Sequence, residues 1–325
     1  MRDKRHIPVL LREVLESFQP LKDAYIIDGT FGAGGYSRAF LEAGASVLAV
    51  DRDPEAIAEG QSLVTMYPER FTLHHTRFSQ IEQFVHHPIS GIILDIGVSS
   101  MQIDEAERGF SFRKDGPLDM RMEQNGVCAA DIVNTASAKD LSRIFYCLGE
   151  ERHANKIAFM IERRRKTKPF LRTLDLAEAV ESCIGRFGKQ KIHPATRVFQ
   201  ALRIYINDEL GELYKLLLLA EKLLPAGGRL GIVTFHSLED RLVKQFFCQR
   251  SQAPAVSRHL PILEASSASF KLLFKGYKGA TETEIKENPR ARSAKLRVAV
   301  RTEAPVKIIQ GKNTDLAYFP RLGEK

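Results

Sequence analysis

The sequence has few cysteines and no long hydrophobic run. Its four cysteines lie far apart and form no C-x-x-C pair, so we expect no structural zinc site and no bound metal. The most apolar stretch, residues 216–220, is followed by Glu221 and Lys222, whereas a membrane span needs roughly 20 apolar residues. The charged first residues run into no apolar core of a signal peptide. We therefore expect a cytoplasmic protein that does not enter a membrane.

The composition is that of an ordinary soluble globular protein. Hydrophobic residues make up 44% and charged residues 27% of the 325 residues, which excludes collagen-like, disulfide-scaffold and largely disordered proteins. The length predicts about two domains. Lysine and arginine exceed aspartate and glutamate by 48 − 40 = 8. This excess is compatible with a polyanionic partner if the positive charges are clustered.

Short apolar runs that end in an aspartate recur in the first half of the chain. Residues 25–27 lead to Asp28, residues 47–50 to Asp51 and residues 92–94 to Asp95, and a similar run follows at 230–233. Runs of this kind are typical of strands that are buried on both faces of a parallel sheet. Helical segments lie between them, and Asp53-Pro54 is a typical helix start. The alternation predicts an open, doubly wound α/β fold.

The alternation stops near residue 101 and resumes with a buried strand near residue 230. Between these points we expect helices at 138–148, 152–166 and 174–185, and one long helix that begins at residues 193–197 and continues past residue 210. The predicted organisation is a discontinuous core, residues 1–106 and 210–325, with an inserted all-helical domain at 107–209.

The loop Asp28-Gly29-Thr30-Phe31-Gly32-Ala33-Gly34-Gly35 follows the first predicted strand and precedes a helix, as a nucleotide-cofactor loop does. It is not a dinucleotide motif, because Ser37 stands at the third glycine position, and no G-K-[ST] follows as in a P-loop. Asp51 is placed to accept from ribose hydroxyls. Asp28 would repel a pyrophosphate but attract a sulfonium. These residues favour S-adenosyl-L-methionine over NAD.

Asp95 is the candidate catalytic residue. It ends a predicted buried strand and is followed by glycine and small residues. A carboxylate there can accept a hydrogen bond from an exocyclic amine and localise the nitrogen lone pair, which aligns a weak nucleophile for methyl transfer. A contact with the cofactor and a capping role in the next turn remain alternatives for Asp95.

Basic side chains gather in several segments that are candidates for RNA contacts. Residues 152–172 hold eight basic residues against the single acid Glu162, and a second cluster spans 290–301. A loop at 108–122 alternates arginines with aromatic residues or methionines, as RNA-binding loops do. With the helix residue Arg197 and with His236, which is predicted to position the substrate, the candidate RNA contacts are Arg113, Arg121, Arg163, Arg164, Arg197, His236, Arg290 and Arg292.

The chain resembles the bacterial 16S ribosomal RNA cytosine-N4 methyltransferase family. The matching stretches are His6–Leu11, Asp28–Gly35, Asp51–Pro54, Asp95–Asp104, Arg108–Phe112, Leu118–Met122, His193–Leu210, Phe235–Lys244 and Asn288–Arg297. The resemblance implies a Rossmann-like class I core that uses S-adenosyl-L-methionine to methylate the exocyclic amine of a decoding-centre cytidine. It implies cofactor contacts at Gly34, Gly35, Tyr36, Asp51, Phe78, Asp95 and Gln102, with Phe78 stacking near the adenine.

The sequence departs from the family pattern at two positions. Tyr36 stands where the family usually has histidine, and Met101 replaces a usual proline. The implied partner is 16S rRNA within the small ribosomal subunit, and the oligomeric state stays open, a dimer included. Two other functions are weighed on the residues alone. One is an NAD-dependent dehydrogenase, and the other is a non-catalytic RNA-binding assembly factor.

Overall fold

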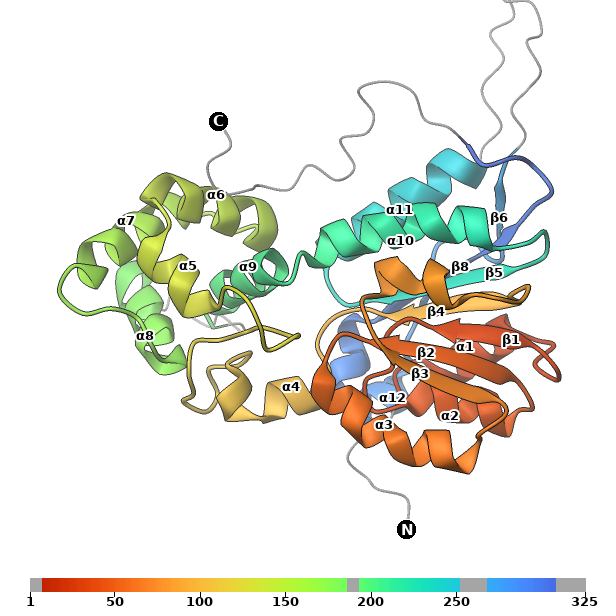
Figure 1. The fold of residues 1–325 in the computed structure, drawn as a ribbon. Coiled ribbons are helices and arrows are strands. Elements are labelled where there is room, and N and C mark those ends of the chain that lie inside the picture. Colours follow the sequence, from red (N-terminus) through yellow and green to blue (C-terminus); the bar gives the residue numbers. More distant parts are fainter. Residues whose placement is uncertain (1–7, 186–192, 252–267, 308–325) are drawn as a thin grey trace, which may run out of the picture. The chain divides into compact units, whose positions relative to one another are not determined.

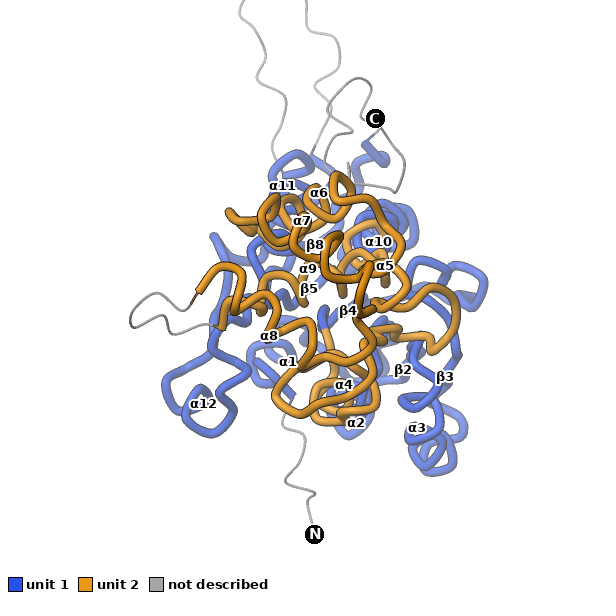
Figure 2. Tube along the Cα trace, turned by 90° about the vertical axis from the view of Figure 1, so that its left-hand side faces the viewer, with its two compact units in different colours: residues 1–97, 212–317 blue, residues 98–211, 318–325 orange. Residues whose placement is uncertain are grey.

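The computed structural model describes residues 8–185, 193–251 and 268–307. They divide into two compact units, of which unit 1 is drawn from residues 1–97 and 212–317 and unit 2 from residues 98–211 (Figure 2). The sequence predicts domain boundaries between residues 106 and 107 and between residues 209 and 210. These domain boundaries stay a prediction.

Unit 1 is built on one mixed sheet of eight strands in the described residues, in the order β3-β2-β1-β4-β5-β8-β6, with β7 paired to β8. The five strands from β3 to β5 are parallel, and β8 runs antiparallel to β5. The strands are β1 (Tyr25–Asp28), β2 (Ser46–Asp51), β3 (Phe71–His75), β4 (Gly91–Asp95), β5 (Arg229–Thr234), β6 (Phe270–Leu272), β7 (Lys278–Gly279) and β8 (Lys295–Arg301).

The predicted α/β class is confirmed, and so are the strands expected from the apolar runs. β1, β2 and β4 end at Asp28, Asp51 and Asp95, the aspartates at which the three apolar runs stop. The helix start at Asp53-Pro54 is also confirmed, since the Asp53 side chain accepts from the backbone N–H of Glu55.

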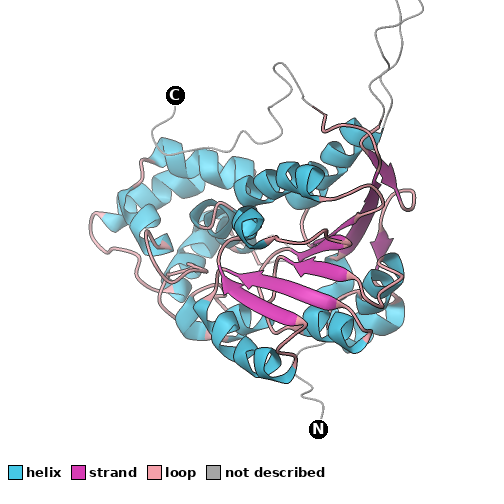
Figure 3. Ribbon diagram, turned by 45° about the vertical axis from the view of Figure 1, so that its right-hand side comes forward, coloured by secondary structure: helices cyan, strands magenta, loops and turns pink. Residues whose placement is uncertain are grey.

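Helices cover both faces of the sheet (Figures 1 and 3). α10 and α11 lie on one face, with η1 beside them, and α1, α2 and α3 lie on the other (Figure 1). The helical elements of unit 1 are α1 (Leu11–Ser17), α2 (Gly35–Glu42), α3 (Pro54–Met66), η1 (Phe78–Phe84), α10 (Glu209–Leu223, from residue 212 on), α11 (Ser237–Ser251), α12 (Glu282–Glu287) and η3 (Pro289–Ser293).

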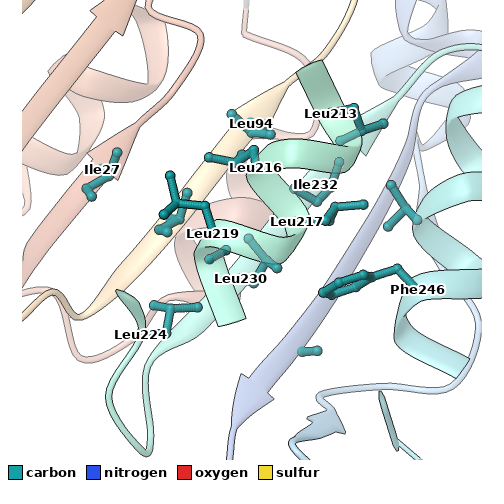
Figure 4. Packing of buried hydrophobic residues seen from close by; sticks show 14 of the residues in the cluster. Ile27, Leu94, Leu213, Leu216, Leu217, Leu219, Leu224, Leu230, Ile232 and Phe246 are labelled. Atoms are coloured by element: carbon teal, nitrogen blue, oxygen red, sulfur yellow. The ribbon is translucent and has the colours of Figure 1, made fainter. Parts of the chain in front are cut away.

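The main core of unit 1 lies between the sheet and the helices α10 and α11 (Figure 4). α10 presents Leu213, Leu216 and Leu217 at helical spacing, and all three are fully buried. Burying a leucine side chain stabilises the fold by about 1.5–3 kcal/mol. Other members of this core are Ile27, Leu94, Leu230, Ile232 and Phe246. The packing holds β1, β4 and β5 together and thereby fixes where their carboxyl ends lie.

Unit 2 consists of helical elements and one isolated bridge, between Pro117 and Arg172, in the residues described. The helices are α4 (Ser100–Asp104), η2 (Ala106–Arg108), α5 (Ala129–Thr135), α6 (Ala138–Gly149), α7 (Ala154–Arg165), α8 (Thr173–Ile184) and α9 (Thr196–Ile206). The three helices expected at 138–148, 152–166 and 174–185 are therefore present. No helix in the described part of the chain has both the length and the apolar character that crossing a membrane requires.

The expectation of one long helix through residue 207 is wrong. α9 ends at Ile206 and α10 begins at Glu209, and Asp208 between them has a left-handed φ of 47°. Asn207 explains the break. Its side chain is 2% exposed, accepts from Met122 N at 2.9 Å and donates to Met120 O at 2.8 Å. These bonds to a loop far away in the sequence end α9 at this point, although the hydrophobic pattern continues through it.

Replacing Asn207 should destabilise unit 2. In Asn207→Ala the buried backbone groups of Met120 and Met122 lose their partners, so the free energy of unfolding should fall by about 2–5 kcal/mol. Chemical denaturation measures it. Gln200→Ala, which removes a side chain of α9 with a single long bond to Leu148 O, should cost under about 1 kcal/mol. Equal losses in the two variants would contradict this role of Asn207.

Candidate functional site

The carboxyl edge of the parallel strands in unit 1 carries the candidate site. β1 and β4 are neighbours in the sheet although β2 and β3 come between them in sequence, so the strand order reverses at this pair. Open α/β sheets bind ligands at the carboxyl ends of the strands where the order reverses. Asp28 pairs in register with Ile93, which places Asp28 and Asp95 at adjacent strand ends.

The glycine loop folds around Asp28. Thr30 N donates to Asp28 Oδ1 at 3.2 Å, and Ser37 Oγ donates to Asp28 Oδ2 at 2.7 Å. The carboxyl group is 1% exposed, and burial raises its pKa to about 6 against the opposing effect of these bonds. Gly34 caps α2 with a φ of 75°, a conformation that glycine adopts without strain. Asp28 therefore shapes the loop as well as adding negative charge.

Asp51 holds the same loop from the neighbouring strand. Its Oδ2 accepts from Gly32 N at 2.8 Å and its Oδ1 from Asp53 N at 2.9 Å. Burial raises the pKa of the carboxyl group, and the backbone donors oppose the rise. A carboxylate offers about four acceptor positions, so these two bonds leave capacity for hydroxyl groups of a ligand.

Asp95 is the candidate catalytic residue, and its Oδ1 atom is shielded from solvent. Within the described residues this oxygen has no hydrogen-bond partner. The residue's backbone is fixed, because Asp95 N donates to Thr30 Oγ1 at 2.6 Å. Burial raises the pKa of Asp95, and the negative charges of Asp28 and Glu239 add to the rise, so that together they bring it to about 8. A hydrogen-bond donor or a positive charge brought by a ligand would satisfy this group.

Glu239 is a member of this acidic group that the sequence reasoning missed. It is fully buried in the first turn of α11, and its Oε2 accepts from Phe235 N at 2.8 Å and from His236 N at 3.2 Å. The His236 Nε2 atom lies 2.8 Å from Glu239 Oε1. An acid three positions into a helix that follows a strand is a capping signal, and that signal was available in the sequence.

The residues at the start of α2 bind the N-terminal segment. The Tyr36 hydroxyl donates to Val9 O, and a Cβ on Gly35 would lie 2.3 Å from Pro8 Cγ. Burial raises the pKa of Tyr36 well above its ordinary value, and the charges of Asp95 and Asp28 add to the rise. Gly35 therefore permits close approach of the protein's own chain. Contacts of Gly34, Gly35 and Tyr36 with a cofactor stay predictions.

Phe78 is the first residue of η1 and lies next to the glycine loop. A Cβ on Gly29 would lie 3.2 Å from Phe78 Cβ, so the aromatic residue packs directly against the loop. This position agrees with the predicted place of Phe78 near a cofactor. The contact between Phe78 and the adenine stays a prediction.

Gln102 belongs to unit 2, where it has a local structural role. It is 5% exposed in α4, its Oε1 accepts from Ser99 N at 3.0 Å, and its own N–H donates to Ser99 Oγ at 3.2 Å. This capping box orients the start of α4. The predicted cofactor contact of Gln102 remains a prediction.

Two of the arginines predicted to contact RNA serve the folding of unit 2. Arg121 pairs with Asp119 at 2.7 Å, and Arg164 pairs with Asp175 at 3.1 Å. The Arg164 guanidinium also lies over the Phe170 ring, 4.6 Å from its centroid. A run of basic residues in sequence therefore contains members whose charge is already used within the protein.

The second basic cluster is largely structural as well. Lys295 and Arg297 both bind Asp240, at 3.1 and 2.8 Å, and Arg301 is buried with its guanidinium donating to backbone carbonyls. Arg290 is partly buried. RNA contact stays a prediction for every candidate, and the exposed ones are Arg113, Arg163, Arg197 and Arg292.

The arrangement suits a ligand that is positively charged and rich in hydroxyl donors. Asp28 and Glu239 place negative charge near Asp95 Oδ1, which can accept from a donor, and Asp51 offers acceptor positions beside the glycine loop. S-adenosyl-L-methionine has a sulfonium and ribose hydroxyls, so the residues present fit this cofactor. A pyrophosphate would be repelled by the same carboxylates.

Comparison with known proteins shows one matching family and several similar proteins. Residues 3–302 match the MraW methylase family. The "Ribosomal RNA small subunit methyltransferase H" of Bartonella tribocorum is 61% identical over 303 residues, which cover 93% of this chain and 91% of that protein. The protein of the same name from Brucella anthropi is 57% identical over 307 residues, covering 93% and 88%. A solved rRNA methylase from Streptococcus thermophilus is 11% identical, with a TM-score of 0.43 and coverage of 91% and 99%.

Removing the charge of Asp95 should stabilise unit 1 at high pH. Folding raises the pKa of Asp95 from an ordinary value near 3.9 to about 8. The folded protein therefore loses free energy of unfolding as the pH rises from about 4 to about 8, because the buried group must give up its proton. Asp95→Asn avoids the loss, so its stability advantage should grow by roughly 1 kcal/mol per pH unit between pH 5 and 8. Thermal unfolding across this pH range measures the advantage.

Asp240→Asn is the matched control with the opposite sign. Burial alone would raise the pKa of Asp240, but hydrogen bonds from Arg297 and Lys295 outweigh burial and lower it. The charged form is therefore the stabilising one, and Asp240→Asn should lower the melting temperature at neutral pH. An Asp95→Asn variant that is no more stable at pH 8 than at pH 5, relative to the wild type, would contradict the assignment.

Proposed function

The chain belongs to the MraW methylase family, and from this premise we propose that it transfers the methyl group of S-adenosyl-L-methionine to the N4 amine of a decoding-centre cytidine in 16S rRNA. Membership in a methylase family confirms the resemblance noted in the sequence. It also excludes the dehydrogenase and the non-catalytic assembly factor that the residues alone had left open.

The names of the relatives support ribosomal RNA as the substrate class. Both the Bartonella and the Brucella proteins are named as methyltransferases of small-subunit ribosomal RNA, and each aligns over most of this chain. The net charge of +8 is compatible with such a polyanionic substrate. We place the reaction in the cytoplasm, on 16S rRNA within the small ribosomal subunit.

The observation that carries the proposal is the unpartnered Oδ1 atom of Asp95. An exocyclic base amine is a weak nucleophile because its lone pair is delocalised into the ring. A carboxylate oxygen that accepts from the amine N–H localises that lone pair on nitrogen and orients it. Asp95 Oδ1 is buried, fixed through its backbone bond to Thr30 and unused by any described protein donor.

The surrounding carboxylates support the charge changes of the reaction. The cofactor, when bound, supplies a methyl group on a positively charged sulfur, which is an activated leaving group. Transfer would form an N–C bond and break the S–C bond, leaving S-adenosylhomocysteine with a neutral sulfur, and the cationic amine would then release one proton to solvent. Asp28 and Glu239 keep the potential around Asp95 negative throughout, which favours the cationic amine.

The remaining predicted contacts would hold the cofactor. Asp51 would accept from the ribose hydroxyls, and Phe78 would stack near the adenine beside the loop that contains Gly34, Gly35 and Tyr36. The contact of Gln102 with the cofactor also belongs to this proposal. Since Asp51 and Asp28 bind the loop's own N–H groups, a change at either residue would also loosen the loop.

A methyl-transfer assay tests the function directly. Wild-type protein, radiolabelled S-adenosyl-L-methionine and small subunits or 16S rRNA that lack the modification should yield N4-methylcytidine on nucleoside analysis. Asp95→Asn should reduce kcat at least about 100-fold, because a neutral amide oxygen accepts more weakly from the amine and does not stabilise the positive charge that develops on it. The folded variant should still bind the cofactor in calorimetry.

Asp23→Asn is the control for the same chemical change at an exposed site. Asp23 has a left-handed φ of 59°, which asparagine tolerates, so activity should stay at the wild-type level. Failure to form N4-methylcytidine on any assembly state of the substrate would refute the proposed function. Wild-type turnover by Asp95→Asn would remove Asp95 from the catalytic role.

A further inference from the structure

The outward face of α7 in unit 2 carries cations around an exposed aromatic ring. Lys156, Phe159, Arg163 and Lys166 follow one another at intervals of three, four and three residues, so they lie on one side of the helix. The three cations are exposed, and the Phe159 side chain is 64% exposed. The apolar residues Ile157, Ala158 and Ile161 are buried on the opposite side.

These three cations have exposed side chains for which the described residues supply no partner. Within the described ranges, none of the Lys156, Arg163 and Lys166 side chains forms an ion pair or a hydrogen bond. The neighbouring arginines differ, because Arg164 pairs with Asp175 and Arg165 donates to Val133 O at 2.8 Å. In the run Arg163–Lys166, Arg164 and Arg165 therefore stabilise the fold, whereas Arg163 and Lys166 are exposed and available to a partner.

α6 continues this face with a second exposed aromatic residue. Ser142 Oγ of α6 donates to Asn155 Oδ1 of α7 at 2.5 Å in an exposed bond, which marks the solvent side of the packed helix pair. Tyr146 lies one turn beyond Ser142 and is 67% exposed, and Phe159 lies one turn beyond Asn155. Figure 1 shows the two helices as neighbours in unit 2. We call Tyr146, Lys156, Phe159, Arg163 and Lys166 the α6–α7 surface.

The chemistry of this surface matches single-stranded nucleic acid. Unpaired cations bind phosphates, and exposed aromatic rings stack on bases, which is the combination that binds single strands. A membrane-binding helix would need a continuous apolar face toward the bilayer. On α7 that face is buried in the protein, and the outward side has one aromatic residue among three cations.

We propose that the α6–α7 surface binds unpaired nucleotides of the rRNA substrate other than the cytidine that is methylated. Lys156, Arg163 and Lys166 contact phosphates, and Phe159 and Tyr146 stack on bases. The surface offers no carboxylate acceptor for an amine, so it serves affinity and positioning rather than chemistry. This inference rests on the proposed function for the identity of the RNA.

The test uses the full chain and a transcript of the decoding-centre region of 16S rRNA, with small subunits as a second probe. Lys156→Gln combined with Arg163→Gln should weaken binding about tenfold at roughly 0.1 M salt. The slope of log affinity against log salt should become shallower by about 1.4, which is about 0.7 for each lost phosphate contact. In methyl transfer, KM for RNA should rise and kcat should change little.

Phe159 has its own signature. Phe159→Leu should weaken RNA binding roughly 5- to 100-fold without changing the salt slope, because a stacked base is lost but no charge is. Phe159→Tyr should restore binding, since any aromatic ring can stack. If leucine binds RNA as well as phenylalanine does, the stacking role is overturned.

Lys22→Gln combined with Lys271→Gln is the charge-matched control. Both lysines are exposed in unit 1, so the net charge falls equally, but affinity and salt slope should stay close to wild type. If the control pair and the α7 pair weaken binding equally, the effect is one of net charge and the proposed surface is overturned. An α7 pair that binds both RNA probes like the wild type overturns it as well.

Two further outcomes separate this inference from its alternatives. Sedimentation with vesicles of phosphatidylglycerol that depends on Lys156 and Arg163, together with unchanged RNA binding, would assign the surface to a membrane and overturn the proposal. A wild-type protein that methylates no rRNA but binds it through these residues would refute the proposed function and leave the surface standing. A wild type that binds neither RNA probe would overturn both.

Discussion

A buried carboxylate oxygen without a hydrogen-bond donor is costly in a folded protein, and among the residues that the structure describes Asp95 Oδ1 is such an atom. Unit 1 places this atom where the strand order of the sheet reverses and adds Asp28 and Glu239 near it, which makes its ionisation still less favourable. The arrangement destabilises the fold in the absence of ligand. It becomes favourable when a cation and an N–H donor arrive, as both do in methylation of a base amine.

The rest of unit 1 holds this strained arrangement in place. The leucines of α10 and the strands they cover keep β4 beside β1 and β5, so the strand ends cannot move apart to relieve the repulsion. The glycine loop is tied from two sides, because Asp28 and Asp51 each accept from its backbone N–H groups. Thr30 then links the loop to Asp95 itself. Loop, strands and catalytic candidate therefore form one hydrogen-bonded assembly.

The fold and the acidic strand ends could be predicted because they depend on local pattern. An apolar run that stops at an aspartate marks both a buried strand and its end, and this pattern located Asp28, Asp51 and Asp95. Phe78 came only from the family resemblance, since no local pattern distinguishes an aromatic residue beside a loop from one in a core. Glu239 was missed although its place in the first turn of a helix is a recognised signal.

The features that the sequence did not show concern partners that are far apart in sequence. The break between α9 and α10 depends on Asn207 reaching Met120 and Met122. The division of the basic clusters into structural and exposed members depends on Asp175 for Arg164 and on Asp240 for Arg297. Composition counts all of these charges alike, and only the three-dimensional structure shows which are neutralised by a neighbour.

The pKa of Asp95, measured by NMR titration of its labelled carboxyl carbon with Asp95→Asn for assignment, tests the central claim most directly. The account predicts a value of about 8 in the ligand-free protein. It also predicts a clear fall on saturation with S-adenosyl-L-methionine and a smaller fall with S-adenosylhomocysteine, whose sulfur is neutral. An ordinary value near 3.9, or a value that neither ligand changes, would contradict it.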